Sequence, residues 1–276
     1  MKLKKVLADT ANKLSESGIE GAARDARILT AYALDTQISE LSIMTNEQVS
    51  EKLISKLEKL ILRRIDREPI SKILGRREFW GRSFFINENV LDPRGDTETL
   101  IDFVIEKPVK SVLDLGTGSG AIAVTLACEW KEVHVTAIDI SEDALSLAKL
   151  NAEKFNVQSK IHFLKSDWFE AVKGPFDLII SNPPYIGLIE RDEISTEVIK
   201  YDPEIALFAG HDGLNAYKKI IPNLVKFLNP DGFVVLEIGA SQSNQVKNMM
   251  NAVGFIDTQI VKDLSGKDRL VAAKFS

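Results

Sequence analysis

The chain has 276 residues, of which 45% are apolar and 27% are charged, as is ordinary for a soluble globular protein. No apolar run approaches the roughly 18 residues of a membrane span, so we expect no membrane association. The single cysteine, Cys128, excludes an intramolecular disulfide framework and favours a reducing, cytoplasmic location. The histidines lack metal-ligand spacing, and we expect no metal site. They are His134, His162 and His211.

The charge is unevenly distributed along the chain. Residues 1–80 hold 15 Lys/Arg and 12 Asp/Glu, whereas the remainder holds 20 and 28. Duplex nucleic-acid binding depends on phosphate neutralisation by a basic surface, which this acidic body does not provide. We therefore expect no stable nucleic-acid binding.

Residues 1–75 carry only helical periodicity and predict an N-terminal helical bundle. Thr45 and Gln48 form a possible capping box for a third helix, which Pro69 ends. The face of that helix opposite its apolar residues is cationic. It carries Lys52, Lys56, Lys59, Arg63 and Arg67. Most such faces are simply solvated, and the alternative is recognition of a substrate protein.

Residues 76–95 predict a β-hairpin linker, because residues 77–86 are rich in aromatics with Gly81 near the middle. Strands and helices then alternate through residues 96–276, the pattern of a parallel sheet with crossover helices. We expect strands at residues 109–115, 133–139, 160–164, 176–181, 233–238, 255–261 and 269–274, the last two pairing with each other. The fold class is thus α/β, with a Rossmann-like seven-stranded sheet.

A glycine loop, Asp114-Leu115-Gly116-Thr117-Gly118-Ser119-Gly120, joins the first strand of this sheet to a helix. Its glycines let a ligand approach the backbone, and the helix N-terminus favours polar or anionic groups. Gly116, Gly118 and Ala121 also satisfy the dinucleotide pattern. The loop alone therefore does not separate NAD from S-adenosylmethionine (SAM).

Acidic and aromatic residues follow the next strands. Asp139 ends the second strand, where it could accept both hydroxyls of a ribose or cap the following helix, although Ser141 could provide that cap. Asp167 and Trp168 follow the third strand, where an adenine ring would lie, unless Trp168 is a core residue. Glu237 ends the fifth strand, and we interpret it as structural.

Asn182-Pro183-Pro184-Tyr185 follows the buried fourth strand. Two prolines cannot continue a strand, so the chain turns stiffly at the carboxyl end, where ligands of open α/β sheets bind. An amide, free carbonyls and a flat ring make a slot for a small planar group that bears an NH2. The alternative is a capped turn with a surface tyrosine.

These motifs resemble class I SAM-dependent methyltransferases, and the Asn182–Tyr185 turn resembles that of members that methylate amino or amide nitrogen. From about residue 68 onward the chain is similar to the peptide chain release factor glutamine methyltransferase family. The motifs that carry this likeness are Glu68-Pro69-Ile70-Ser71-Lys72-Ile73-Leu74-Gly75, Glu78-Phe79-Trp80-Gly81, Pro93-Arg94 with Thr97-Glu98, Tyr201-Asp202-Pro203 with Ala206-Leu207, Asp212-Gly213-Leu214 and Glu237-Ile238-Gly239.

The resemblance implies methylation of the glutamine side-chain nitrogen, N5, in the Gly-Gly-Gln loop of bacterial class-1 release factors, with SAM as cofactor. The catalytic residues would be Asn182, Pro183 and Tyr185, and the substrate slot Asn182–Tyr185. The SAM-binding residues would be Gly116, Thr117, Gly118, Ser119, Gly120, Asp139, Asp167, Trp168 and Asn182. We expect a monomer.

Three other functions are compatible with parts of the sequence. A DNA or RNA adenine-N6 methyltransferase shares the Asn-Pro-Pro-Tyr turn, but it needs base flipping and a basic surface. An NAD-dependent oxidoreductase fits the glycine loop and leaves the turn unexplained. A non-catalytic adaptor leaves the whole constellation without a role.

Overall fold

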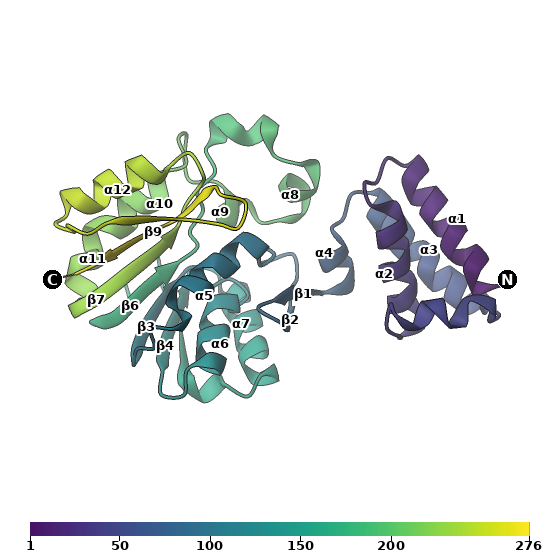
Figure 1. The fold of residues 1–276 in the computed structure, drawn as a ribbon, viewed down its shortest axis with the longest axis horizontal. Coiled ribbons are helices and arrows are strands. Elements are labelled where there is room, and N and C mark those ends of the chain that lie inside the picture. The colour runs from purple at the N-terminus through teal and green to yellow at the C-terminus, as the bar shows by residue number, and fades with distance from the viewer. Residues whose placement is uncertain (276) are drawn as a thin grey trace. The chain divides into compact units, whose positions relative to one another are not determined.

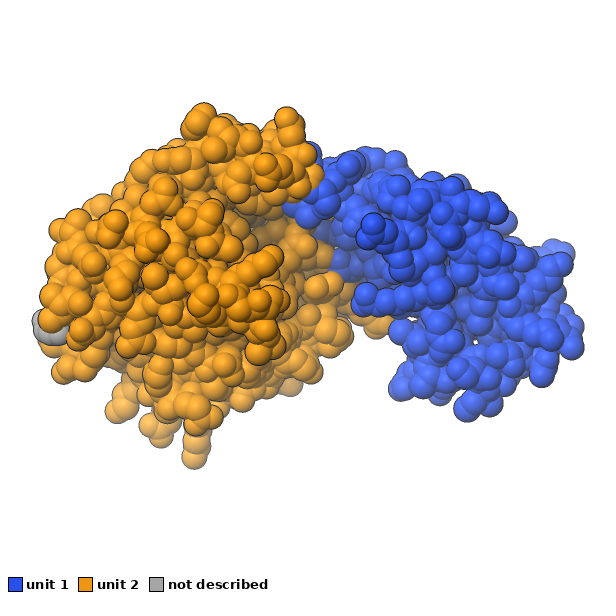
Figure 2. Space-filling model, turned by 45° about the horizontal axis from the view of Figure 1, so that its top comes forward, with its two compact units in different colours: residues 1–75, 195–201 blue, residues 76–194, 202–276 orange. Residues whose placement is uncertain are grey.

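The computed structural model describes residues 1–275, which form two compact units (Figure 2). Unit 1 comprises residues 1–75 together with residues 195–201, and unit 2 comprises residues 76–194 together with the chain from residue 202 on. A short segment from the second half of the sequence is thus part of the N-terminal unit. None of the helices in the described part of the chain could cross a membrane.

Unit 1 is helical (Figure 1). It contains α1 (Leu3–Glu16), α2 (Ala22–Leu34), α3 (Glu51–Ile65), α4 (Ile70–Leu74) and α8 (Thr196–Tyr201). Its core forms where the apolar faces of the first three helices meet, with Leu14, Leu29 and Leu57 almost completely buried. Arg64 in α3, itself buried, pairs with Asp25 at 2.7 Å and with Glu197 at 2.8 Å, so α8 is held to this unit by a charged hydrogen bond.

The predicted capping box at Thr45 is wrong. Thr45 lies in a single 3-10 turn, and α3 begins later, with Ser50 as its N-cap accepting from the backbone N–H of Leu53 at 3.2 Å. Gln48 lies before the helix, in a backbone bridge with Lys2, and so is not the third residue of a helix that Thr45 could cap. Pro69 precedes α4 and is not the residue at which α3 ends.

Three of the five cations on α3 and just beyond it have partners inside unit 1. Lys56 donates to the carbonyl of Ala33 at 3.0 Å, Arg63 pairs with Glu68, and Arg67 donates to the carbonyl of Gly18. The two remaining cations, Lys52 and Lys59, are exposed and pair with none of the residues that the structure describes. The cationic face is therefore narrower than the sequence suggests.

Unit 2 begins with the predicted β-hairpin, formed by β1 (Arg76–Phe79) and β2 (Arg82–Phe85). Both turn residues have positive φ, 49° at Trp80 and 67° at Gly81, as the tight two-residue turns of hairpins require. Phe79 and Phe84 are fully buried in the core beneath the sheet. The hairpin is thereby fixed to unit 2.

The predicted seven-stranded sheet is confirmed. Its strands are β3 (Ser111–Leu115), β4 (His134–Asp139), β5 (Ile161–Lys165), β6 (Phe176–Ser181), β7 (Leu228–Glu237), β8 (Gln259–Lys262) and β9 (Asp268–Lys274). Their order is β5-β4-β3-β6-β7-β9-β8, parallel except for β9, which is antiparallel to both of its neighbours. Strands that follow β3 in the sequence lie first on one side of it and then, from β6 on, on its other side. Ligands of open α/β sheets bind at such a switch point, so a ligand site is expected at the carboxyl ends of β3 and β6.

Helices cover both faces of this sheet (Figure 1). One face packs on α5 (Glu98–Ile105), α6 (Ala121–Glu129) and α7 (Glu142–Lys154), and the other on α10 (Asn215–Ile220), α11 (Leu224–Phe227) and α12 (Ser243–Ala252). Successive residues of a strand point alternately to the two cores. In β3, Leu113 lies between Val112 and Asp114, and it belongs to the core on one face whereas Val112 belongs to the core on the other. Both faces are apolar, as buried parallel strands require.

Two elements near the end of the chain differ from expectation. The crossover helix that the alternating pattern predicts before the fifth strand is interrupted by a 3-10 turn at Ile221–Asn223, because Pro222 has no N–H to donate within a helix. The strand after it begins at Leu228 instead of residue 233, since Leu228 already pairs with Phe176 across a register shift. Between β6 and α10 the chain also forms a short helix, α9 (Glu204–Leu207).

Candidate active site

The Asn-Pro-Pro-Tyr turn lies at the carboxyl end of the central strand β6 and is held on several sides. Ser181, the last residue of β6, donates from its hydroxyl to the carbonyl of Leu115 in β3 at 2.6 Å. The carbonyl of Tyr185 accepts from the side-chain amide of Gln242 at 2.8 Å. Ile186 then pairs with Phe208 as a parallel bridge. The turn is therefore held rigidly at the carboxyl end of β6.

Asn182 has one end of its side-chain amide bound and the other end free. Its Nδ2 donates to the hydroxyl of Thr97 at 3.0 Å, and Oδ1 accepts no hydrogen bond from any described residue. The side chain lines a cavity at the end of the sheet. A carbonyl oxygen of fixed direction is thus available there to accept from a ligand.

Tyr185 points the other way, toward a buried carboxylate. Its hydroxyl donates to Oε1 of Glu237 at 3.4 Å, and the hydroxyl of Tyr217 donates to the backbone carbonyl of the same glutamate at 2.8 Å. Burial raises the pKa of Glu237 to about 7, against the opposing effects of Thr97 and Arg269. Burial and then the charge of Glu237 raise the pKa of Tyr185, so its phenol is neutral at physiological pH.

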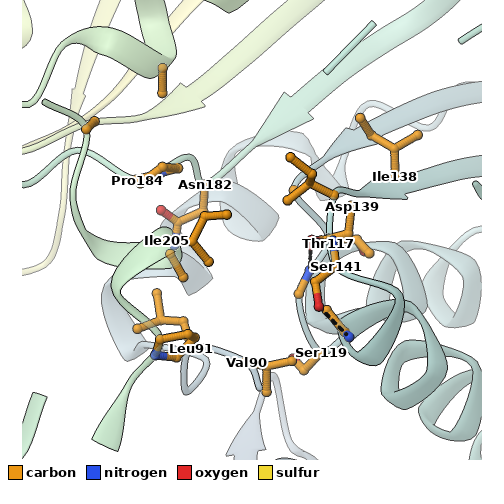
Figure 3. A pocket seen from close by; sticks show the side chains of 18 of the residues that line it. Val90, Leu91, Thr117, Ser119, Ile138, Asp139, Ser141, Asn182, Pro184 and Ile205 are labelled. Atoms are coloured by element: carbon orange, nitrogen blue, oxygen red, sulfur yellow. Dashed lines mark hydrogen bonds between the residues drawn. The ribbon is translucent and has the colours of Figure 1, made fainter. Parts of the chain in front are cut away.

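The cavity has a volume of about 400 Å³ and connects the sequence-predicted residues into one surface (Figure 3). Figure 3 shows Asn182, Pro184 and Ile205 on one side of it, with Thr117, Asp139 and Ser141 facing them. The predicted site residues that line it are Gly116, Thr117, Gly118, Ser119, Asp139, Asp167, Trp168, Asn182 and Pro184. Gly120, Pro183 and Tyr185 are not among the residues that line it.

The glycine loop presents bare backbone to this cavity. Gly116 and Gly118 have φ of 71° and 55°, and a Cβ added to either would meet no atom within 4 Å. Gly120 has another role, since its Cβ would meet that of Ala148 at 3.0 Å. Gly120 thus permits α6 to pack on α7, whereas the two earlier glycines leave space open for a ligand.

Asp114 lies beneath the loop and is completely buried. Its Oδ2 accepts from the hydroxyl of Thr117 at 2.6 Å, which fixes the bend of the loop. Burial raises the pKa of this carboxyl to about 7, although the Thr117 hydrogen bond opposes the shift.

Asp139, at the end of β4, holds the loop from the side. Its two carboxylate oxygens accept from the backbone N–H groups of Gly118 and Ser141, each at 2.9 Å. Burial raises its pKa despite these bonds. The N-cap of α7 is Ser141, which accepts from the N–H of Ala144 at 3.2 Å. Asp139 is therefore free of the capping role, and it lines the cavity.

Asp167 and Trp168 lie together in the cavity wall after β5. Oδ2 of Asp167 pairs with Lys219 of α10 at 3.3 Å. Trp168 has a positive φ of 49° and packs partly against the core below α10 and α11. Trp168 thus lines the cavity and also packs against the core.

Several cavity residues were not predicted as part of the site. Val90 and Leu91 form one wall, and Ile205 and Phe208 form part of another. The Pro93-Arg94 and Thr97-Glu98 motif was the available signal, because Thr97 is the residue that anchors Asn182. Apolar wall residues in loops carry no periodicity that would reveal them.

Strand order, the glycine loop after β3 and the proline turn after β6 together define a class I methyltransferase domain. A family model for the methyltransferase small domain matches residues 88–205, and one for the PrmC N-terminal domain matches residues 5–75. A release factor glutamine methyltransferase of Cereibacter sphaeroides is 41% identical over 95% of this chain and 94% of its own length. The chain belongs to the release factor glutamine methyltransferase family.

A second group of relatives is longer than this chain. The bifunctional methyltransferase of Rickettsia felis is 40% identical over 98% of this chain, which spans only 57% of that protein. Among solved structures, the hMettl16 catalytic domain in complex with MAT2A 3'UTR hairpin 6 superposes with a TM-score of 0.58 at 17% identity, covering 82% of this chain and 81% of that one. At such identity the likeness concerns the fold alone.

Proposed function

We propose that this protein transfers a methyl group from SAM to the side-chain amide nitrogen of the glutamine in the Gly-Gly-Gln loop of class-1 peptide chain release factors. The observation that carries the proposal is that Asn182 lines the cavity with an Oδ1 that accepts from no described residue, while Thr97 holds the other end of the amide. Membership of the family supports the choice of a glutamine amide over a nucleobase.

The cavity fits SAM in size and in the chemistry of its walls. About 400 Å³ lies within the range of small-molecule sites, roughly 300–1,000 Å³. The open space beside Gly116 and Gly118 lets a ligand lie against the backbone, and Asp139 offers carboxylate lone pairs suited to ribose hydroxyls. Asp167 and Trp168 would flank the adenine. When bound, SAM supplies a methyl group on a positively charged sulfur.

The protein's own contribution to the reaction is positioning. An amide nitrogen is a weak nucleophile because its lone pair is delocalised into the carbonyl. Oδ1 of Asn182 and the carbonyl of Pro183, neither of which accepts a hydrogen bond from a described residue, would accept the two amide hydrogens of the substrate. Fixing the nitrogen in this way is worth up to about 7–11 kcal/mol in favourable cases. Tyr185 would support this slot from behind, where its hydroxyl bonds to Glu237.

Atoms and charge balance without a strong base. The glutamine nitrogen contributes the electron pair of the new N–C bond, and the S–C bond of the cofactor breaks with its pair remaining on sulfur. One amide proton leaves to water after transfer. The low acidity of the Tyr185 phenol agrees with a packing role for this side chain in place of proton transfer.

Unit 1 is the proposed recognition domain for the release factor. The match of residues 5–75 to the PrmC N-terminal domain supports this assignment. So do Lys52 and Lys59, two exposed cations of α3 that no described residue of the chain neutralises. We also infer a monomer, because the proposed catalytic groups all come from one chain. We infer that it acts in the cytoplasm, where release factors work.

The decisive experiment is methylation of purified release factor by the full-length protein with SAM, followed by mass spectrometry of the peptide containing Gly-Gly-Gln. A mass gain of one methyl group on that glutamine is expected. Single-stranded and duplex DNA and RNA serve as parallel substrates. Methylated adenine together with an unmodified release factor would reverse the assignment in favour of a nucleic-acid methyltransferase.

A further inference from the structure

Three large aliphatic side chains are exposed in the segments that follow the Asn-Pro-Pro-Tyr turn. Leu188 and Ile189 begin the 3-10 helix η5 (Leu188–Glu193), and Ile205 lies in α9. Their exposed fractions are 50%, 64% and 61%. A single exposed aliphatic residue is ordinary, whereas several on neighbouring elements beside a cavity mark an interaction site. Leu188, Ile189 and Ile205 are called the aliphatic rim below.

Backbone and side-chain contacts hold the two parts of the aliphatic rim together. The N–H of Leu188 donates to the carbonyl of Gly210 at 2.9 Å. Arg191 of η5 pairs with Glu204 of α9 at 2.6 Å, and its guanidinium carbon lies 5.0 Å from the centre of the Phe208 ring. Residues three apart in a 3-10 helix share a face, so Leu188 lies on the same face of η5 as Arg191. That face is the one turned toward α9.

Ile205 places the aliphatic rim at the opening of the proposed active site. It lines the cavity although most of its surface is exposed, so it stands where the cavity meets solvent. Figure 3 shows it on the same side of the cavity as Asn182. Gly210, whose carbonyl holds Leu188, lines the cavity as well. Leu188 and Ile189 are not among the lining residues, which places them outside the space for the cofactor.

The proposed substrate must lie across this opening. Only two methylene groups join the amide of a glutamine to its own main chain. When the amide bonds to Asn182, the main chain of the substrate therefore lies at the opening, and the residues beside the glutamine lie near the aliphatic rim. On the amino side these residues are two glycines, which have no side chain to offer. An apolar contact with the rim accordingly comes from the residues that follow the glutamine.

We propose, on the basis of the methyl transfer proposed above, that the aliphatic rim binds an apolar side chain that closely follows the methylated glutamine in the substrate. The slot at Asn182 recognises only an amide and does not distinguish one exposed glutamine from another. Burial of aliphatic surface from both partners supplies the second element of recognition. The charges beside the rim do not oppose it, because Arg191 and Glu204 neutralise each other.

The test compares rim variants with a matched control, all in the full-length protein. Leu188→Ser with Ile189→Ser, and separately Ile205→Ser, should raise KM for the release factor about tenfold, with kcat at saturating release factor changed less than about twofold. Ile205→Val stays apolar and should keep the wild-type KM. Ile256→Ser makes the same change at an isoleucine before β8 that is 76% exposed, and it should leave KM unchanged. A wild-type KM in both rim variants, with melting curves showing an intact fold, would overturn the proposal.

A double-mutant cycle identifies the part of the substrate that the rim binds. Each of the three residues after the glutamine of the release factor is replaced in turn by serine. At the position that reaches the rim, serine should raise KM about tenfold for the wild type and hardly further for Ile205→Ser, because the contact is already lost there. Effects that multiply independently at all three positions would show that the rim binds no residue following the glutamine, and would refute the proposal.

Calorimetric titration with the release factor separates this proposal from the proposed function. If the wild type binds the release factor without methylating it, and the rim variants bind about tenfold more weakly, the chemistry is wrong and the rim stands. If methylation occurs and the rim variants bind as the wild type does, the reverse holds. A wild type that neither methylates nor binds refutes both. A dimer in gel filtration that Leu188→Ser with Ile189→Ser dissociates would assign the rim to a second copy of the chain and so also overturn the proposal.

Discussion

Asn182 and Thr97 are 85 positions apart in the sequence, and the amide of one donates to the hydroxyl of the other over 3.0 Å. The bond joins the end of β6 to the start of α5, and it uses the donor end of the asparagine within the protein. The acceptor end is left for a ligand. A residue that only capped its own turn would have bonded to backbone within a few positions.

Replacing Asn182 by alanine should reduce catalysis far more than stability. The substituted side chain can no longer accept from the substrate amide, and the nitrogen is no longer aimed. We expect kcat to fall at least about a hundredfold, with a smaller change in SAM affinity, because the lost interaction acts mainly in the transition state. Single-turnover kinetics beside a melting curve measure both effects.

Asn182→Asp is the matched variant. It keeps size and an acceptor but loses the Nδ2 donor to Thr97 and adds a charge, so it too should be slow. Should either variant show near-normal kcat together with a lowered melting temperature, Asn182 would be a structural cap and nothing more.

The glycine loop offers a prediction in which two glycines give opposite outcomes. Gly118→Val should abolish SAM binding, because the new side chain fills the open space on the cavity side of the loop, while the fold persists. The positive φ of 55° adds strain of about 1–2 kcal/mol for a non-glycine residue. Titration calorimetry with SAM measures the affinity, and circular dichroism checks the fold.

Gly120→Ala is the control for that measurement. Its Cβ would come within 3.0 Å of the Cβ of Ala148, so the cost is overpacking between α6 and α7, about 1–3 kcal/mol of stability, in addition to the backbone strain of a φ of 80°. Folded Gly118→Val that binds SAM with wild-type affinity would remove the glycine loop from the cofactor site.

Local sequence patterns predicted the sheet well, because the apolar run of each strand follows directly from the burial of that strand. β6 begins and ends where its apolar run does, at Phe176 and Ser181, since both of its faces are covered. The glycine loop and the proline turn were also recognisable, because few sequences satisfy the backbone geometry that they need. The cavity accordingly unites nine of the predicted site residues.

The features that were missed depend on contacts between distant parts of the chain. The segment 195–201 belongs to unit 1 through the pairing of Glu197 with Arg64, which no local pattern reveals. The hydrogen bond from Tyr185 to Glu237 likewise appears only once β6 and β7 are assembled. Three of the predicted surface cations turned out to bond within unit 1 for the same reason.

The buried carboxyl of Asp114 should make the stability of the protein fall as pH rises. Its pKa increases from the ordinary aspartate value of 3.8 to about 7 on folding, so the folded state binds the proton more tightly. The resulting penalty is absent below about pH 4, grows between pH 4 and 7, and is complete above 7. Asp114→Asn should therefore gain about 3 kcal/mol more relative to wild type at pH 8 than at pH 5.

Urea unfolding of both proteins at the two pH values measures this difference. Glu237 has a similarly raised pKa, but it is present in both proteins and cancels in the comparison. An equal difference between variant and wild type at pH 5 and pH 8 would show that Asp114 is ionised throughout, held by the Thr117 hydroxyl.

The exposed cations of α3 should act on recognition of the release factor and not on chemistry. Reversing both charges in Lys52→Glu with Lys59→Glu should raise KM for the release factor about five- to tenfold, because each rim charge pair contributes up to about 1 kcal/mol. SAM affinity and kcat at saturating substrate should not change. The effect on KM should shrink in high salt, which screens exposed charges. Steady-state kinetics at two ionic strengths measure it.

The matched control is Lys131→Glu with Lys149→Glu, which makes the same change in net charge at exposed lysines of unit 2. If recognition depends on where the cations lie, this control keeps a normal KM while the α3 variant does not. An equal rise of KM in both variants would mean that overall charge steers association, and no rise in either would remove Lys52 and Lys59 from recognition. The surface is localised because Lys56, Arg63 and Arg67 already bond within unit 1, so that only Lys52 and Lys59 on this face remain for an acidic partner.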